Sequence, residues 1–546
     1  MQFLSGLFGA GGPPKPTSLL AGQGSDPRLE SLLRNNRGLH RLFPDQPERL
    51  LLLGAALFDR REHDNAMVVL DRAVELGAPP WKVALIRAKR ALLDEQPAAG
   101  LRFLEPFLDE PAHSELLLIA GTCAWEARQM HEAARYYEAG VAMAPRDVDL
   151  LGSLCGAYGM TGQYEKSREI AKRTLLLDPR HASALQNLGI AARELGLLEE
   201  QDDAYLRLCD YYADNERFRC LRAFALLMNE DFTAGWPLHE NRDFRFREQK
   251  FRESTLQRPR WKGESLEGKT LLIVCEQGSG DNFMVARWFP EIKRRGARVV
   301  LECAPYLMAI LARVPGVDQV IQLENAREPD LHYDLWVGSM SLPWIFNATR
   351  ENIYAPPRYL EPGASTTSYW RDLVREVRGL KVGLAWAGNP GHASDISRSM
   401  KFADIDRLFD IPGITFFNLQ VPARDLQERA NLVNHTDELV TFDDTAGLID
   451  QMDLVISVDT SIAHLAAALG RPTWVVTSFR PEWRWGRDDL KVMWYPTARV
   501  YRCDAPLNWR SAIDKVARDL KALAGLPAPA PAPAVSTPTG GAAHVV

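Results

Sequence analysis

The chain has no long apolar run, no cluster of cysteines and no strong net charge. No stretch approaches the roughly 18–20 apolar residues that span a bilayer, so we expect no membrane span. Lys and Arg number 65 against 71 Asp and Glu, a net charge of −6, which gives no general attraction to a nucleic-acid polymer. The seven cysteines are scattered and form no Cys-x-x-Cys pair, so free thiols and a cytoplasmic location are expected.

The length and composition are those of a globular protein with several domains. A chain of 546 residues suggests three or four domains, and 46% hydrophobic with 25% charged residues excludes a fibre or a wholly disordered chain. The apolar start of the chain lacks the positive charge of a signal peptide, so residues 1–40 are interpreted as a flexible N-terminus. Residues 526–546 are rich in Pro and Ala and are predicted to be a disordered tail.

The first half of the chain is an internal repeat. Pro111, Pro145 and Pro179 are spaced by 34 residues, and apolar and small residues recur at the same interval. The pattern predicts an α-solenoid over 41–245, with about five helix pairs between 47 and 215 and then a capping segment. Stacked pairs form a superhelix whose concave groove can dock a peptide or another protein. The alternatives are a dimerisation surface or a spacer.

The second half alternates strands and helices. Buried apolar strands such as LLIVCE, ARVVLEC, KVGLAWAGN and DLVISVD alternate with helical segments, the first of them expected from about 282 to 295. This alternation predicts two Rossmann-like parallel-sheet domains, 262–365 and 380–525, separated by a Pro-rich connector. Two such domains with a cleft between them form the GT-B fold of glycosyltransferases. Sugar-nucleotide epimerases and two-domain dehydrogenases share this geometry, so fold alone does not decide function.

The strongest candidate binding motif is VISVDTSIAH. A strand ends at Asp459, and Thr460 and Ser461 open the next helix. The N–H groups of a helix start, together with two hydroxyls, favour a diphosphate, and His464 is placed to donate to a phosphate oxygen. Ordinary N-capping by Asp459 or Thr460, with His464 half buried, is the alternative.

A second motif, CEQGSGDN, follows the first strand of the α/β half. Gly278 and Gly280 allow a tight turn, and Asp281 at the start of the next helix is the candidate general base for an acceptor hydroxyl. Glu276 at the strand end is the rival base, and N-capping is again the alternative for Asp281. The motif is not G-x-G-x-x-G, so NAD binding is disfavoured.

A third polar loop, WAGNPGHASDISRSMK, follows the first strand of the second α/β domain. Asn389, Arg398 and Ser399 are candidate donor ligands, since Arg398 can pair with a phosphate through two hydrogen bonds. Lys401 is the alternative cation, and His392 has a plain reading as part of a solvated loop.

A fourth segment, EWRWGR, is dense in aromatic and guanidinium groups. Its side chains can stack on a nucleobase or sugar, although packing between domains explains the tryptophans nearly as well. The candidates for contacts to the nucleobase or sugar are Trp485 and Arg487 of this segment, together with Glu276 and Gln277 after the first strand.

No metal site is expected. Asp404-Ile405-Asp406 and Asp147-Val148-Asp149 match a D-x-D pattern formally, but both lie in helical stretches and chance explains them better. No His and Cys cluster has the spacing of metal ligands.

Taken together, these motifs resemble a known family. From about 110 to 520 the chain resembles glycosyltransferases that join tetratricopeptide repeats to a heptosyltransferase-like GT-B module. The resemblance implies sugar transfer from a nucleotide-sugar co-substrate, metal-independent and inverting, with no other cofactor. It implies that Asp281 is the base, that Asp459 to His464 hold the donor phosphates with Ser461 in place of the usual Gly, and that Arg398-Ser399 matches the family's Arg-Ser motif.

The repeats imply a protein acceptor, and flagellin glycosyltransferases have a similar layout. The leading hypothesis is therefore protein O-glycosylation at Ser or Thr, with flagellin as the first candidate acceptor. Two alternatives stay open: a glycolipid or polysaccharide transferase whose repeats recruit a partner enzyme, and a non-catalytic repeat scaffold.

Overall fold

The computed structural model describes residues 46–111, 113–245, 256, 258–322, 331–391, 395–479, 483–487, 490 and 492–526. The expected flexible N-terminus, and all of the expected disordered tail except Leu526, lie outside these residues.

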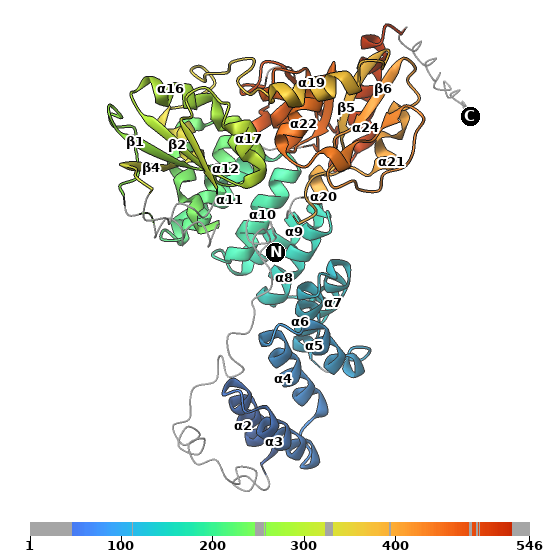
Figure 1. The fold of residues 1–546 in the computed structure, drawn as a ribbon. Helices are drawn as coiled ribbons and strands as arrows, with labels where there is room; N and C mark the ends of the chain where they lie inside the picture. Colours follow the sequence, from blue (N-terminus) through green and yellow to red (C-terminus); the bar gives the residue numbers. More distant parts are fainter. Residues whose placement is uncertain are drawn as a thin grey trace, which may run out of the picture.

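The first half folds into stacked antiparallel helix pairs that extend as an arm from the α/β half (Figure 1). Five pairs fill the segment in which about five were expected, and a sixth, shorter pair with a 3₁₀ turn forms the cap. The pairs are α2 Pro47–Asp59 and α3 His63–Glu75, α4 Pro80–Leu93 and α5 Pro97–Leu104 (extended by η2 Glu105–Phe107), α6 Ser114–Glu126 and α7 Met130–Met143, α8 Val148–Met160 and α9 Tyr164–Leu177, α10 Ala182–Glu194 and α11 Leu198–Tyr211, then α12 Glu216–Met228, α13 Phe232–His239 and η3 Glu240–Arg245.

Complementary side-chain sizes hold each helix pair together. A Cβ added to Gly121 would lie 2.3 Å from the Tyr137 ring, and one added to Gly189 would lie 2.2 Å from the Tyr205 ring. The pair between these two repeats has Cys155 in the glycine's place and a small Ala171 opposite, both fully buried. A larger residue on one helix is therefore matched by a smaller one on its neighbour, as close packing requires.

The first α/β lobe is a parallel sheet of order β3-β2-β1-β4. Its elements are β1 Thr270–Val274, α15 Ser279–Val285, η4 Ala286–Trp288, α16 Phe289–Arg294, β2 Arg298–Cys303, α17 Pro305–Leu311, β3 Gln319–Gln322, β4 Leu335–Gly338, η6 Ser339–Ser341 and α18 Leu342–Ile345. The single helix expected over 282–295 instead starts at Ser279 and is broken by η4. Pro290, near the start of α16, lacks an N–H for a continuous helix, and the buried Arg287 donates to Met284 O.

The second lobe is a parallel sheet of order β10-β9-β8-β5-β6-β7. Its elements are α19 Ala364–Leu373, β5 Leu380–Ala385, α20 Asp395–Arg398, α21 Phe402–Ile405, η7 Asp406–Leu408, β6 Ile414–Asn418, β7 Leu432–Val433, η8 Thr436–Glu438, α22 Phe442–Ile449, β8 Leu454–Val458, α23 Ser461–Ala468, β9 Thr473–Thr477, η9 Trp483–Trp485, β10 Ala498–Arg502 and α24 Trp509–Leu523. Two Rossmann-like lobes following a helical solenoid confirm the predicted fold class.

Both sheets reverse their strand order beside the site. In the first lobe the reversal lies between β1 and β4, and in the second between β5 and β8. Ligands of open α/β sheets bind outside the carboxyl ends of the strands at such a reversal. The loops after β1, β5 and β8 carry the three polar motifs, so the topology brings the motifs to the two switch points.

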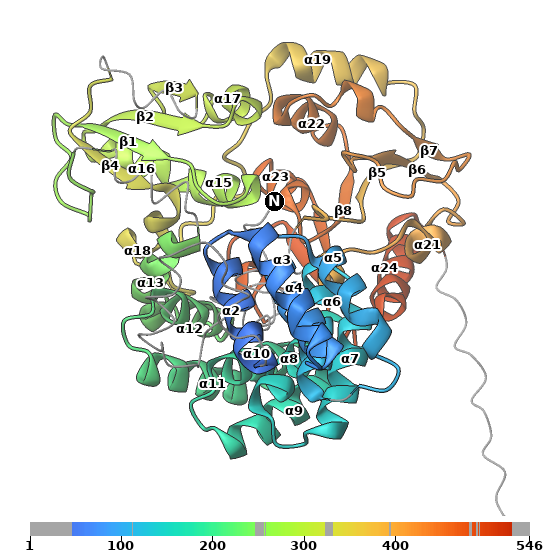
Figure 2. The ribbon, with the colours of Figure 1, turned by 90° about the horizontal axis from the view of Figure 1, so that it is seen from below.

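The lobes contact each other directly. Helices α15 and α23 pack side by side where the lobes meet, as the view from below shows (Figure 2). A second contact lies at the connector, where Asp443 of α22 accepts hydrogen bonds from Arg313, from Gly363 N at 3.0 Å and from the Thr366 hydroxyl at 3.0 Å.

The end of the repeat array packs against both lobes. Trp236 of α13 donates to Ala348 O of the first lobe at 2.7 Å, and its ring centroid lies 5.3 Å from that of Trp483 in the second. Glu230 pairs with Arg350 of the first lobe at 2.6 Å and accepts from the backbone N–H of Arg487 in the second at 3.1 Å. One continuous hydrophobic cluster thus runs from α8 to β10.

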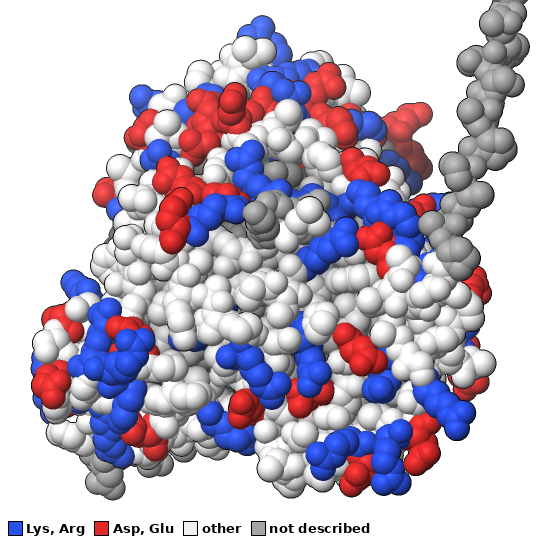
Figure 3. All heavy atoms as spheres, turned by 90° about the horizontal axis from the view of Figure 1, so that it is seen from above, with Lys and Arg blue, Asp and Glu red and all other residues white. Residues whose placement is uncertain are grey.

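Three further properties of the fold concern its cysteines, its helices and its surface charge. All seven cysteines are free thiols, as expected. Among the described residues, no helix combines the length and apolar character of a membrane span. Seen from above, acidic and basic side chains intermingle around the molecule, and a band across the middle of that face has few of either (Figure 3).

Candidate functional site

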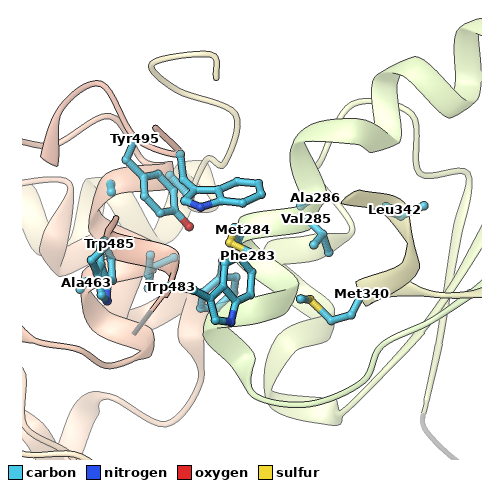
Figure 4. Packing of buried hydrophobic residues seen from close by; sticks show 14 of the residues in the cluster. Phe283, Met284, Val285, Ala286, Met340, Leu342, Ala463, Trp483, Trp485 and Tyr495 are labelled. Carbon is cyan, nitrogen blue, oxygen red and sulfur yellow. The ribbon is translucent and has the colours of Figure 1, made fainter. Parts of the chain in front are cut away.

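The site forms where α15 of the first lobe meets α23 of the second. A Cβ on Gly280 would lie 2.5 Å from Cδ2 of His464, so the histidine ring packs directly on the backbone of α15. Phe283 and its neighbours on α15 face Trp483, Trp485 and Tyr495 across the same interface (Figure 4). The two motifs that the sequence placed in separate domains, Gly-Asp and Asp-Thr-Ser, are therefore in contact.

Asp281 lies in the first turn of α15 and is almost fully buried. Its Oδ2 accepts a hydrogen bond from the backbone N–H of Gly278 at 3.0 Å. Gly278 is the N-cap of α15, so Asp281 is not the N-cap considered as the alternative but makes the reciprocal contact of a capping box from the third helical position. Its Oδ1 accepts two hydrogen bonds from Arg484 of the second lobe, from Nε at 2.8 Å and from Nη2 at 2.5 Å. The candidate base thus contributes to the capping box of its helix and also forms an ion pair across the two lobes.

His464 is buried and held in one orientation. Its Nδ1 lies 2.8 Å from the Tyr495 hydroxyl, and its ring centroid is 4.6 Å from that of Trp485. Burial, with the nearby charges of Arg484 and Arg287, lowers the pKa of His464 well below its ordinary value, and burial raises the pKa of Tyr495. Both groups are therefore neutral at pH 7.

The tautomer of the neutral histidine depends on the direction of its hydrogen bond with Tyr495. When the tyrosine hydroxyl donates to Nδ1, the proton of the imidazole is on Nε2. Nε2 lies 4.0 Å from Oδ1 of Asp459, on the side of the strand end. His464 can thus donate a hydrogen bond there without carrying a charge.

The turn between β8 and α23 is built by hydroxyl and carboxylate contacts. Thr460 is the N-cap, with Oγ1 3.3 Å from Ile462 N and 3.0 Å from the Ser457 hydroxyl. Asp459 accepts from Trp485 Nε1 at 2.7 Å, and Ser461 is the first residue of α23. The N–H groups at the start of α23 lie at the carboxyl edge of the sheet, where an anion is stabilised by the helix dipole.

Arg398 and Ser399 lie in the loop after β5, the neighbour of β8. Asp395 organises this loop: it accepts from the Ser399 hydroxyl and from Arg424 at 3.1 Å. Ser399 in turn accepts from Gly388 N at 2.8 Å, and the Arg398 guanidinium packs against the Gly388 backbone. Asn389 is exposed, with Oδ1 accepting from Gly391 N at 2.9 Å, whereas His392 lies outside the described residues.

The other candidates occupy different environments. Glu276 is fully buried and forms an ion pair at 2.5 Å with the buried Arg242 of the repeat cap, which favours a structural role for it. Gln277 adopts a left-handed backbone conformation with φ 61° and is partly exposed. Trp485 is buried against His464, and Arg487 is exposed.

Sequence reasoning did not identify Arg287, Tyr359 and Tyr495. Arg287 is completely buried and donates to Trp494 O at 2.6 Å and to the Tyr359 hydroxyl at 3.0 Å. Tyr359 in turn hydrogen-bonds Tyr495, so a chain of contacts supports His464. An arginine within the apolar segment FMVARWFP was the available signal, but it does not reveal a partner more than 200 residues away.

The structure gives the two D-x-D matches capping roles. Asp147 caps α8 by accepting from Asp149 N and Leu150 N, and Asp404 accepts from Lys401 N at 2.8 Å. Within the described ranges, no three His, Cys, Asp or Glu side chains group as metal ligands do.

Comparison with known proteins relates part of the second lobe to a glycosyltransferase family. Residues 425–482 match the model of glycosyltransferase family 9 (heptosyltransferase), a range that contains β7, α22, β8, α23 and β9. The chain is 24% identical over 431 residues to Protein FlbA of Caulobacter vibrioides, covering 73% of this chain and 71% of that protein. An alignment of that length includes both the repeats and the α/β lobes.

Solved structures resemble the two halves separately. The E. coli ADP-heptose LPS heptosyltransferase II is 15% identical and covers 46% of this chain and 98% of its own, with a TM-score of 0.35. YrrB, described as a TPR protein with an unusual peptide-binding site, is 16% identical and covers 35% of this chain and 96% of its own, with a TM-score of 0.29.

The chain joins a tetratricopeptide-type repeat array to a module like those of glycosyltransferase family 9, and it is a glycosyltransferase that uses a nucleotide-sugar as co-substrate.

Proposed function

We propose that this enzyme transfers a sugar to Ser or Thr hydroxyls of a protein held by the repeat array. One observation carries the proposal: the last repeats and the cap pack on both lobes, through Trp236 and Glu230, beside the lobe interface that contains Asp281. A protein bound along the array would thus lie next to the lobe interface that contains Asp281. Flagellin is the first acceptor to test, because the layout resembles that of flagellin glycosyltransferases.

The proposed chemistry has one base and one group of donor ligands. The Asp281 carboxylate accepts the proton of the acceptor hydroxyl while that oxygen forms a bond to the anomeric carbon. The bond from the anomeric carbon to the phosphate oxygen breaks, and the nucleotide leaves with the electron pair. General base catalysis of this kind contributes about 10²–10⁴-fold.

The donor ligands that we propose surround the start of α23 and the loop after β5. Hydrogen bonds from helix N–H groups, hydroxyls and an arginine stabilise the charge that develops on the departing phosphate. His464 supplies an uncharged Nε2–H donor. The proposed ligands are Asn389, Arg398, Ser399, Asp459, Thr460, Ser461 and His464, with Gln277, Trp485 and Arg487 as contacts to the base or sugar.

We also propose where the enzyme works and how its chain divides. Seven free thiols and a nucleotide-sugar donor fit the cytoplasm. For experiments that cut the chain, we propose domain boundaries of 41–245, 262–365 and 380–525.

The test is the intact mass of flagellin from cells with and without this gene. Loss of a mass increment on deletion supports the proposal, and the increment constrains the sugar. Complementation with Asp281→Asn should fail to restore the increment, whereas Asp147→Asn should restore it, since asparagine caps α8 as well as aspartate does.

An unchanged flagellin mass removes that acceptor. Full activity of Asp281→Asn on any acceptor contradicts the role of the base. Transfer by the purified enzyme to a cell-surface polysaccharide, but to no protein, supports the glycolipid or polysaccharide alternative.

A further inference from the structure

An arginine of the second lobe forms an ion pair with the carboxylate that we propose as the base. Arg484 donates from both Nε and Nη2 to Oδ1 of Asp281, and both side chains are only 11–12% exposed. The other oxygen, Oδ2, accepts the Gly278 N–H. A hydroxyl can deliver its proton to Oδ1 only after the guanidinium has left, because Oδ1 already accepts two hydrogen bonds.

Arg484 also lies beside the donor end of the site. Its charge is one of the causes that lower the pKa of His464. The next residue, Trp485, donates to Asp459 at 2.7 Å and packs on the His464 ring. The guanidinium is therefore near the start of α23 as well as near Asp281.

The Arg484 guanidinium also packs on a neighbouring aromatic ring. Trp483 is fully buried, and the Arg484 guanidinium lies 4.4 Å from the centre of its ring. The planar guanidinium fits two oxygens of a phosphate as well as it fits a carboxylate. A diphosphate carries more negative charge than one carboxylate, so it competes effectively for the same arginine.

We propose that Arg484 exchanges partners during the reaction. In the donor-free enzyme it pairs with Asp281, and when the nucleotide-sugar binds it moves to the donor diphosphate and leaves Oδ1 of Asp281 free to accept the hydroxyl proton. This inference rests on the proposed function. It makes Arg484 a diphosphate ligand, and it couples exposure of the base to the presence of the donor.

The exchange has a kinetic consequence. Until the donor is bound the base is occupied by an arginine, so the acceptor hydroxyl is activated only in the complex with donor. Negative charge then grows on the departing phosphate, and the contact from Arg484 strengthens as it does so.

A binding experiment tests the exchange without any acceptor. UDP, GDP, ADP and TDP are titrated in turn into the full-length protein by calorimetry, and the nucleotide that binds most tightly is kept as the probe. We expect Arg484→Gln to weaken its binding about ten- to a hundred-fold, because a charged hydrogen-bond pair to phosphate is lost. We expect Asp281→Asn to tighten binding about fivefold or more, because the competing anion is gone.

Two further variants complete the design. The double variant should bind like Arg484→Gln, because the aspartate acts only through the arginine. Arg499→Gln is the matched control, since it removes a pair with Asp519 at 2.9 Å on the outer strand β10 and should leave the affinity unchanged.

The direction in which each substitution shifts nucleotide affinity distinguishes the exchange from a purely structural ion pair between Asp281 and Arg484. If the Asp281–Arg484 ion pair is only structural, both single substitutions should lower the melting temperature, and they should not shift nucleotide affinity in opposite directions. That result overturns the exchange. If either variant unfolds, Arg484→Lys and Asp281→Glu replace them, and the same opposite shifts at smaller size are required. If the wild-type protein binds none of these nucleoside diphosphates, the exchange is overturned, because it requires a diphosphate ligand, whereas the proposed function is still decided by the intact mass of flagellin.

Discussion

Two glycines at the start of α15 should respond differently to alanine: Gly280→Ala should destabilise the protein, whereas Gly278→Ala should leave its stability nearly unchanged. Gly280 lies inside α15, where alanine is normally preferred over glycine by about 1 kcal/mol. Helix propensity alone therefore predicts that Gly280→Ala stabilises the protein. The tertiary contact predicts the reverse, so the sign of the change is informative.

The contact sets the size of the effect. A Cβ at Gly280 would lie 2.5 Å from Cδ2 and 3.2 Å from Cγ of His464, whereas carbon atoms in ordinary contact are about 3.5–4.0 Å apart. The ring must move by about 1 Å, which also lengthens its 2.8 Å contact with Tyr495. Overpacking costs about 1–3 kcal/mol and the hydrogen bond about 1 kcal/mol, so the gain from propensity is exceeded.

Gly278→Ala is the matched control. The nearest atom to its added Cβ is Oδ2 of Asp281 at 3.3 Å, and its φ of −87° suits alanine. Both substitutions restrict the unfolded chain equally, so this effect cancels in the comparison. The change expected for Gly278→Ala is within about 0.5 kcal/mol.

Calorimetric unfolding and nucleoside diphosphate binding are the assays. Gly280→Ala should unfold at lower temperature than Gly278→Ala and bind nucleotide at least about tenfold more weakly, because His464 is displaced. Equal stability and equal affinity in the two variants would refute the packing of His464 on α15.

Three other predictions follow from buried groups. Arg242→Met removes the guanidinium that pairs with Glu276 and should cost about 3–5 kcal/mol in denaturant unfolding, with most of the loss recovered when Glu276→Gln is added. The histidine takes up a proton near pH 6.5 in the unfolded chain, whereas the buried His464 of the folded protein does not. The free energy of unfolding should therefore fall by up to about 1.4 kcal/mol per pH unit as the pH drops below about 6.5. His464→Asn should remove this part of the pH dependence of stability. Burial raises the pKa of Cys123 and Cys155 to about 12, so both should resist iodoacetamide at pH 8 in the folded protein and react in urea, as peptide mass spectrometry would show.

Most of the fold that could be predicted from the sequence was predicted from local sequence patterns. The 34-residue spacing of Pro111, Pro145 and Pro179 reflects helix pairs whose contacts are between neighbours in sequence, and the structure has those pairs. The alternation of apolar strands with helices likewise predicted two parallel sheets. The break at η4 was not predicted, although Pro290, which has no N–H for a continuous helix, was a local signal for it.

The pairing of side chains across the site could not be predicted in the same way. Asp281 and Arg484 are 203 residues apart, and Arg287 and Trp494 are 207 apart, so no sequence period links them. Sequence reasoning placed Asp281 at a helix start, and the structure places it there, but the arginine that pairs with it comes from a segment noted only for stacking. Position at a strand end is a local property, whereas the partner of a charge depends on how the lobes pack.

The packing between the array and the lobes also limits how the repeats can be removed. Deletion of residues 1–230 would seem to separate a protein transferase from a carbohydrate transferase. That cut removes α12, whose Phe224 belongs to the same hydrophobic cluster as Trp236 and Trp483, and it leaves both tryptophans uncovered. The clusters of the outer helix pairs do not reach the lobes, so a cut before α6 spares the junction, although it divides the cluster that α6 shares with α4 and α5. Because the inner repeats and the lobes share one core, the proposed function requires that an acceptor bound to those repeats is held at a fixed distance from Asp281, and its register along the repeats would then decide which hydroxyl reaches the proposed base.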